Sequence, residues 1–196
     1  MPTIYVIRHG KAAAGWDADK DPGLDATGQA QAEAAAVEIA RRTGSPLPLV
    51  SSPLKRCRET AVPLASAWSL VPAIEPRVAE IPSPIDDVAA RVGWLRKTMS
   101  GTWAEATSAE ANADHLHFVQ TLLDWRRNLA EAVLELTQDT IIFSHFIAVN
   151  VLVGHAQKDD RVTIFQPDNC SVNIFNTDGG VLSVVELGRE ASTRVN

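Results

Sequence analysis

A short apolar segment that ends in a charged and reactive tripeptide constrains this 196-residue chain more than any other feature. Residues 3–7 (TIYVI) are β-branched or aromatic, without a strict polar alternation. This pattern is typical of a strand that is covered on both faces in a parallel sheet. Arg8, His9 and Gly10 follow directly. Because open α/β sheets bind ligands beyond the carboxyl ends of their strands, Arg8 and His9 stand where a substrate would lie.

The residue types at this strand end suit an anionic substrate. Arg8 offers a planar fork of N–H donors for phosphate oxygens, and a neutral imidazole such as His9 is a usable nucleophile near pH 7. Gly10 can adopt backbone conformations that other residues resist, and it lets a ligand come close. Taken alone, the tripeptide is weak evidence and fits a surface Arg-His pair just past a strand better than a catalytic site.

Composition limits the class of protein. The length favours one domain over residues 1–196, and the net charge of −6 with a pI near 5.3 argues against a nucleic-acid partner. No segment reads as a targeting leader or a membrane span. Cys57 and Cys170 form neither a disulfide framework nor a metal-ligand pattern. We therefore expect a cytoplasmic protein without a membrane partner, a metal or another cofactor.

Caps, apolar spacing and turn residues predict alternating strands and helices. A helix should run from the N-cap Asp25 to Thr43, with Gly44 as its stop. Asp178, Gly179 and Gly180 predict a hairpin. Further strands are expected at residues 47–51, 73–75, 141–143, 171–176 and 181–187, and further helices at 86–99 and from 114 onward. The predicted fold is an α/β three-layer sandwich, with a largely parallel central sheet flanked by helices and a helical insertion.

A second basic motif follows the strand at residues 47–51. Pro53 precedes a helix that starts at Leu54, and the free N–H groups of its first turn can hold an anion. Arg56 and Arg58 are two residues apart on this helix, so they point to different sides. One of them can enter a pocket, or both can be solvated surface cations.

Three motifs in order now resemble a known family. They are Arg8-His9-Gly10 after a strand, residues 24–32 (LDATGQAQA) and residues 51–61 (SSPLKRCRETA). Together they closely resemble the histidine phosphatase superfamily, which includes the phosphoglycerate mutases. The resemblance resumes at residues 140–145 (TIIFSH), where the family has a strand that ends in its second active-site histidine.

The resemblance implies a function for each matching residue. His9 would be the nucleophile that accepts the phosphoryl group, and Arg8, Arg56 and His145 would complete the phosphate pocket without a metal. Taken without the resemblance, a histidine such as His145 is usually a core or capping residue. Phe146 stands where the family usually has Gly, which makes that side of the pocket more apolar.

The general acid is harder to place. The family carries a Glu in the loop after its third strand, and Glu80 is the best match, although the usual Gly- and Trp-containing surroundings are missing. Burial could raise the pKa of Glu80 so that it protonates the leaving oxygen, but a plain exposed Glu also fits. Asp86 and Asp87 are reserve candidates that look like helix-start residues.

Residues from about 80 to 137 diverge from the family and are expected to form a helical cap. Trp94, Trp103 and Trp125 fall here and either choose the leaving group or only pack. Trp16, in the loop that follows Gly10, is a candidate lid residue or a packing residue. The remaining polar candidates are expected to have structural roles, His115 and His117 as surface or core residues and Asn169 as a turn residue.

The sequence therefore predicts a metal-independent phosphatase that forms a phosphohistidine on His9 and acts on a small phosphorylated metabolite. Three alternatives stay open: a protein phosphohistidine phosphatase, a phosphotransferase of the phosphoglycerate mutase type, and a phosphate-binding module without turnover. The sequence does not indicate the natural substrate or the oligomeric state.

Overall fold

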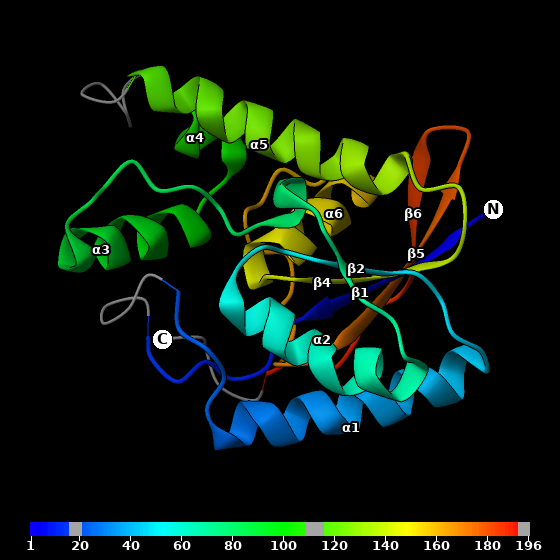
Figure 1. Ribbon diagram of the computed structural model, residues 1–196. Helices are drawn as coiled ribbons and strands as arrows, with labels where there is room; N and C mark the ends of the chain where they lie inside the picture. The colour runs from blue at the N-terminus through cyan, green and yellow to red at the C-terminus, as the bar shows by residue number, and fades with distance from the viewer. Residues whose placement is uncertain (16–20, 109–115, 192–196) are drawn as a thin grey trace.

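A six-stranded mixed sheet with helices on both faces forms the centre of the molecule (Figure 1). The computed structural model describes residues 1–15, 21–108 and 116–191. The strand order is β3-β2-β4-β1-β5-β6. The sheet consists of the parallel strands β3 (Ala73–Ile74), β2 (Leu49–Ser51), β4 (Thr140–Ser144) and β1 (Thr3–Arg8), followed by the antiparallel hairpin β5 (Val172–Asp178) and β6 (Val181–Glu186). The predicted three-layer α/β architecture is confirmed.

The helices cover the two faces of this sheet in pairs. On one face lie α1 (Ala26–Thr43) and α2 (Lys55–Trp68), and on the other lie α5 (Leu116–Leu134) and α6 (Phe146–Gln157) (Figure 1). The segment between β3 and α5 contains the 3-10 helix η1 (Pro76–Val78), α3 (Val88–Met99) and α4 (Trp103–Ala106). The range predicted as a helical cap, about residues 80–137, holds α3, α4 and also α5, which covers a face of the sheet (Figure 1).

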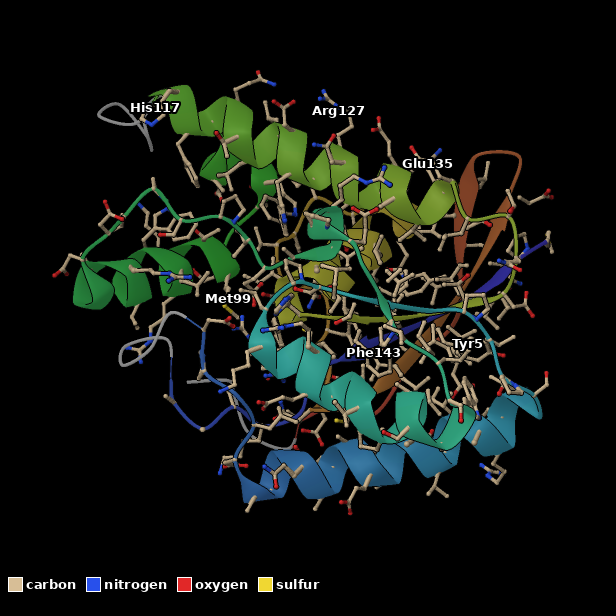
Figure 2. The ribbon with its side chains drawn as sticks, in the orientation of Figure 1. Tyr5, Met99, His117, Arg127, Glu135 and Phe143 are labelled. Atoms are coloured by element: carbon tan, nitrogen blue, oxygen red, sulfur yellow. The ribbon has the colours of Figure 1, made fainter. Side chains whose placement is uncertain are left out.

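Successive side chains of β1 pack into different halves of the core. Ile4 and Val6 belong to the large cluster that includes α5 and α6, whereas Ile7 belongs to the cluster under α1 and α2. Tyr5 and Phe143 lie on this second side, between the sheet and α2 (Figure 2). Because both faces of β1 are covered, the residues that follow Ile7 are held firmly at the end of a buried strand.

Local capping explains why α1 begins and ends where the sequence predicts. The Asp25 carboxylate accepts a hydrogen bond from the Gly28 N–H at 2.7 Å, which satisfies one free donor of the first turn. Gly44 follows the helix with a φ of 67°, a conformation that favours glycine. The predicted bounds of α1 are confirmed.

Three details of the fold differ from the sequence predictions. The second helix begins at Lys55, because Leu54 is its extended N-cap and Pro53 lies outside it. α4 was not anticipated, since it is four residues long and depends on a capping box between Thr102 and Glu105. β3 pairs over only two residues.

Trp16 and His115 lie outside the described residues. Among the helices that the structure describes, none has the length and apolarity needed to cross a bilayer.

Candidate active site

Strand register brings three distant parts of the chain together at the carboxyl ends of neighbouring strands. Arg8 at the end of β1 pairs with Ser144 at the end of β4, and Ser51 at the end of β2 pairs with Phe143. The next residue of each strand is therefore His9, His145 or Ser52. Since adjacent strands are about 4.8 Å apart, these three side chains become close neighbours.

His9 has a defined tautomer. Its Nδ1 lies 2.7 Å from the carbonyl oxygen of Gly10, and because a carbonyl can only accept, Nδ1 carries the proton. The lone pair of Nε2 faces Arg56, whose Nε donates to it at 3.1 Å. Burial, followed by the positive charges of Arg56 and Arg8, lowers the pKa of His9 well below its ordinary value. His9 is therefore a neutral imidazole whose Nε2 carries a lone pair.

The backbone around His9 is held from several directions. The His9 N–H donates to the Ser144 carbonyl at 2.9 Å, and the Asn169 side chain donates to the His9 carbonyl at 3.0 Å. The Gly10 N–H donates to Thr60 Oγ1 at 3.0 Å. Asn169 lies in a turn, as predicted, and that turn fixes the backbone of His9.

Gly10 is required for a reason that differs from the prediction. Its φ is not in the left-handed region. A Cβ on Gly10 would lie 2.6 Å from the carbonyl oxygen of Gly28, in the first turn of α1. Close packing of the strand end against α1, rather than an unusual backbone conformation, excludes other residues here.

Arg8 is buried beside the same strand end. Its Nη1 donates to the Pro167 carbonyl at 2.8 Å, and its Cζ lies 5.2 Å from the centre of the Phe146 ring. Burial lowers the pKa of Arg8, against the opposing effect of Glu80. Phe146 is a core residue that stacks under the guanidinium, so a ring that replaces the usual glycine supports Arg8. Arg8 Nε is buried without a hydrogen-bond partner among the described residues.

Arg56 enters the site and Arg58 does not. The Arg56 side chain is 4% exposed, with Nη2 3.6 Å from Glu80 and Nη1 3.9 Å from Asp21. Arg58 is exposed, so the two arginines divide as their spacing predicts. The start of α2 does bind an anion, which belongs to the chain itself: the Lys55 N–H donates to Asp21 Oδ1 at 2.7 Å.

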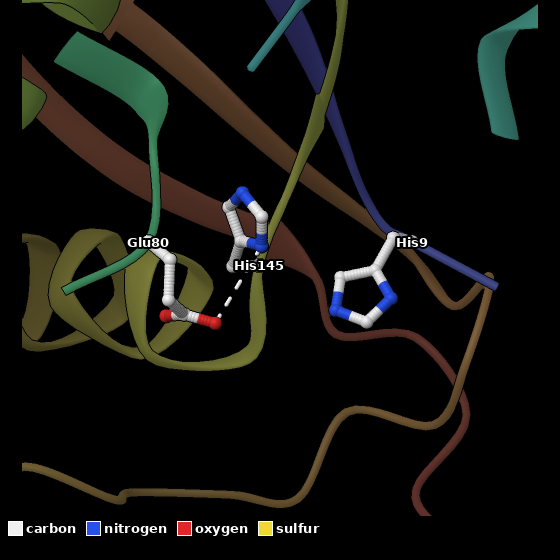
Figure 3. Close-up of side chains that lie close together, drawn as sticks. All are labelled: His9, Glu80 and His145. Carbon is white, nitrogen blue, oxygen red and sulfur yellow. Dashed lines mark ion pairs between the residues drawn. The ribbon is translucent and has the colours of Figure 1, made fainter. Parts of the chain in front are cut away.

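Glu80 and His145 form the other half of the cluster, as Figure 3 shows. Glu80 Oε2 lies 3.5 Å from His145 Nδ1, and the rings of His145 and His9 meet edge to face with centroids 5.3 Å apart (Figure 3). Burial raises the pKa of Glu80, and the Arg56 charge opposes this rise. Burial also lowers the pKa of His145, helped by His9 and the two arginines. Glu80 is therefore a buried carboxyl and not a plain surface residue.

The insertion holds Glu80 through packing and two hydrogen bonds. The Ile81 N–H donates to Glu80 Oε1 at 3.1 Å, and the Trp125 indole donates to the Ala79 carbonyl at 3.2 Å. Trp103 packs beside Trp125 with ring centroids 6.0 Å apart. These contacts support the packing interpretation of the tryptophans, and one of them also positions the loop that carries Glu80.

Trp94, the third tryptophan of the insertion, and the reserve carboxylate Asp87 have contacts of their own. Trp94 packs edge to face on Phe118, 5.8 Å away. Asp87 caps α3 by accepting from the Ala90 N–H at 2.8 Å, and Asp86 is exposed. His117 is exposed on α5.

The cluster has donor atoms that can hold a metal ion. One ligand atom from each of His9, Glu80 and His145 falls within 4.8 Å of the others. The guanidinium groups of Arg8 and Arg56 act electrostatically on both histidines. Their charges oppose a divalent cation and favour an anion in the same place.

Sequence inspection missed two groups beside His145. Ser52 Oγ lies 2.8 Å from His145 Nε2, and Cys57 Sγ lies 3.4 Å from the same nitrogen. Both residues are completely buried. The only available signal was that Ser52 follows a strand, and the contact depends on the pairing of β2 with β4.

The family model of the histidine phosphatase superfamily (branch 1) matches residues 4–190. The chain belongs to the histidine phosphatase superfamily. A search of curated proteins found no relative of this member of the superfamily.

Solved structures share the fold of this superfamily member at low sequence identity. "Mycobacterial hydrolase 1" superposes with a TM-score of 0.70 at 20% identity, over 97% of this chain and 100% of that one. Mycobacterial glucosyl-3-phosphoglycerate phosphatase, with bound VO3, gives 0.64 at 20% identity over 97% and 100% of the two chains. Phosphoserine phosphatase of Entamoeba histolytica, in complex with 3-phosphoglyceric acid, gives 0.68 at 20% identity over 99% and 98%.

Proposed function

We propose that this superfamily member is a phosphatase that hydrolyses a small phosphomonoester through a phosphohistidine on His9. The observation that carries the proposal is the state of His9: its Nδ1 proton is held by the Gly10 carbonyl, and its Nε2 lone pair faces the Arg56 guanidinium. A nucleophilic nitrogen beside two buried cations is suited to a phosphoryl group and to little else.

The first step transfers the phosphoryl group to the enzyme. In the free protein Arg56 Nε donates a hydrogen bond to His9 Nε2. When substrate binds, a phosphate oxygen accepts this hydrogen bond instead, and Nε2 then attacks phosphorus. The Nε2–P bond forms as the bond from phosphorus to the leaving oxygen breaks. Arg8 and Arg56 stabilise the charge that spreads over the non-bridging oxygens. Arg8 Nε and Glu80 Oε2, which lack hydrogen-bond partners among the described residues, are placed to contact the substrate.

Glu80 is the general acid in this scheme. Its raised pKa favours the protonated form, which donates a proton to the leaving alkoxide. In the second step the Glu80 carboxylate accepts a proton from the attacking water. The water oxygen bonds to phosphorus as the Nε2–P bond breaks, inorganic phosphate is released, and both His9 and Glu80 return to their starting states.

The charges of Arg8 and Arg56 support a reaction without a metal cofactor. The buried free thiols of Cys57 and Cys170 support the cytoplasmic location expected from the sequence.

The neighbours named as phosphatases for glucosyl-3-phosphoglycerate and phosphoserine support a small phosphorylated metabolite as substrate. The proposed catalytic domain comprises residues 1–196.

A metal-free turnover assay tests the proposal. The full-length protein, treated with a chelator, should hydrolyse p-nitrophenyl phosphate, and a rapid base quench should trap an acid-labile phosphoryl group that mass spectrometry assigns to His9. A panel with phosphohistidine peptides and 3-phosphoglycerate separates the alternatives. Exclusive use of phosphohistidine, isomerisation without phosphate release, or vanadate binding with no turnover would each contradict the proposal.

A further inference from the structure

The two ring nitrogens of His145 have different buried neighbours, which bear on which nitrogen carries a proton. Nδ1 faces Glu80 at 3.5 Å, and Nε2 faces Ser52 Oγ at 2.8 Å. Both His145 and Ser52 have no exposed surface, so water does not take over either contact. Because burial lowers the pKa of His145, the ring is neutral and has one proton to place.

The contacts of Ser52 decide where that proton lies. The Leu54 N–H donates to Ser52 Oγ at 3.3 Å and takes one of the two acceptor sites of the hydroxyl, whose buried proton still needs an acceptor. His145 Nε2 is the strongest acceptor near it. The other neighbour is Cys57 Sγ, a weak acceptor whose own S–H donates to the Ser144 carbonyl at 3.3 Å. Burial raises the pKa of the Cys57 thiol, so it carries no charge.

We propose that Ser52 is a positioning residue that donates to His145 Nε2 and thereby keeps the proton of His145 on Nδ1, directed at the phosphoryl group. This inference rests on the proposed function. With the proton on Nδ1, His145 donates a hydrogen bond to a phosphate oxygen. With the proton on Nε2, a lone pair would face the phosphate and repel it, a loss of the kind caused by a wrong histidine tautomer in other enzymes.

Ser51 provides a matched control. It is also completely buried and precedes Ser52, but its hydroxyl donates to the Ser52 carbonyl at 2.9 Å and not to an imidazole. Ser51→Ala and Ser52→Ala therefore remove the same atom from adjacent buried sites. Ser52→Thr keeps a hydroxyl at position 52.

The kinetic test compares these variants on p-nitrophenyl phosphate. Ser52→Ala should lower kcat roughly 10- to 100-fold, the size of loss known for partners that orient metal-bound histidines, with a smaller change in KM. Ser51→Ala should stay within about 3-fold of the wild type, and Ser52→Thr should recover most of the activity. Equal activity of Ser52→Ala and Ser51→Ala would overturn the proposal.

A spectroscopic test needs neither turnover nor a stable Ser52 variant. Long-range 15N–1H spectra of the wild-type protein with 15N-labelled histidine, assigned with a His145→Gln variant, should show a protonated Nδ1 and an unprotonated Nε2 for His145. A protonated Nε2 would overturn the assignment. A wild-type protein that hydrolyses no phosphomonoester would contradict the proposed function, whereas the tautomer in the free protein would still decide the role of Ser52.

Discussion

The two sides of the pocket are held in different ways. On the sheet side, His9 makes contacts through its ring, its N–H and its carbonyl, and Arg8 is fixed by Pro167 and Phe146. On the insertion side, two hydrogen bonds hold the Glu80 loop, one from the Ile81 N–H to the Glu80 carboxylate and one from the Trp125 indole to the Ala79 carbonyl. Arg91 of α3 has its Nε buried without a hydrogen-bond partner among the described residues.

This difference separates two tasks. The sheet side fixes the nucleophile and the phosphate-binding cations, because strand register and buried hydrogen bonds leave them little freedom. The insertion side supplies the proton and the surroundings of the leaving group through fewer contacts. We therefore expect changes on the sheet side to affect all substrates alike and changes on the insertion side to depend on the leaving group.

The largest effect should come from the nucleophile. His9→Ala should reduce hydrolysis of aryl and alkyl phosphates alike by at least about 10³-fold, because the variant lacks the nitrogen that forms the covalent intermediate. Steady-state kinetics on both substrates measure this loss. His155→Ala, an exposed histidine at the end of α6, is the control and should be fully active. A His9→Ala variant with normal turnover would exclude the mechanism.

A smaller and selective effect is expected from the acid. Glu80→Gln should slow an alkyl phosphate by about 100-fold and p-nitrophenyl phosphate by less than about 10-fold, because a good leaving group needs little protonation. The ratio of kcat/KM for the two substrates measures the selectivity. Asp87→Asn, which changes a carboxyl on the same insertion, serves as control. Equal slowing of both substrates would remove Glu80 from the role of acid.

The pH profile should show the same selectivity. The acid must be protonated, so hydrolysis of an alkyl phosphate should fall as the pH rises through the raised pKa of Glu80. Because the pKa of His9 lies well below its ordinary value of about 6.5, the ring stays neutral and activity should persist into the acidic range. Profiles of kcat/KM from acidic to alkaline pH test both limbs. An alkaline limb that survives in Glu80→Gln would show that another group causes it.

The smallest effect should come from Arg91. Its positive charge helps to lower the pKa of Glu80, although burial dominates. Arg91→Gln should therefore move the alkaline limb for an alkyl phosphate slightly upward in pH and leave aryl phosphate turnover almost unchanged. Arg96→Gln, an exposed arginine on the same helix, should cause no shift. A limb that moves downward would mean that Arg91 does not act on Glu80.

Sequence reasoning succeeded where the cause was local. The caps Asp25 and Gly44 act within a few residues, and the alternating strands and helices followed from apolar runs and turn residues. The residues Arg8, His9, Arg56 and His145 were found because motifs mark them, and the structure brings them together. Their catalytic roles remain predictions.

The features that were missed depend on distant contacts. Ser52 meets His145 across 93 positions of sequence, and the register of β2 and β4 alone makes them neighbours. The sequence suggested that Gly10 is needed for an unusual backbone conformation. In the structure, a side chain at position 10 would instead collide with the carbonyl oxygen of Gly28 in α1. The burial of Glu80 follows from the packing of the insertion, which apolar spacing does not reveal.

The turn at residues 167–170 also determines when the site can be completed during synthesis. His9 is synthesised well before its partners: the Pro167 carbonyl that binds Arg8 and the Asn169 amide that binds the His9 carbonyl are made about 160 residues later. At about 5–20 residues per second, the nucleophile waits on the order of 10 seconds for these partners. A nascent chain that stops before residue 167 can carry every residue of the phosphate pocket and still lack the contacts that hold it in place.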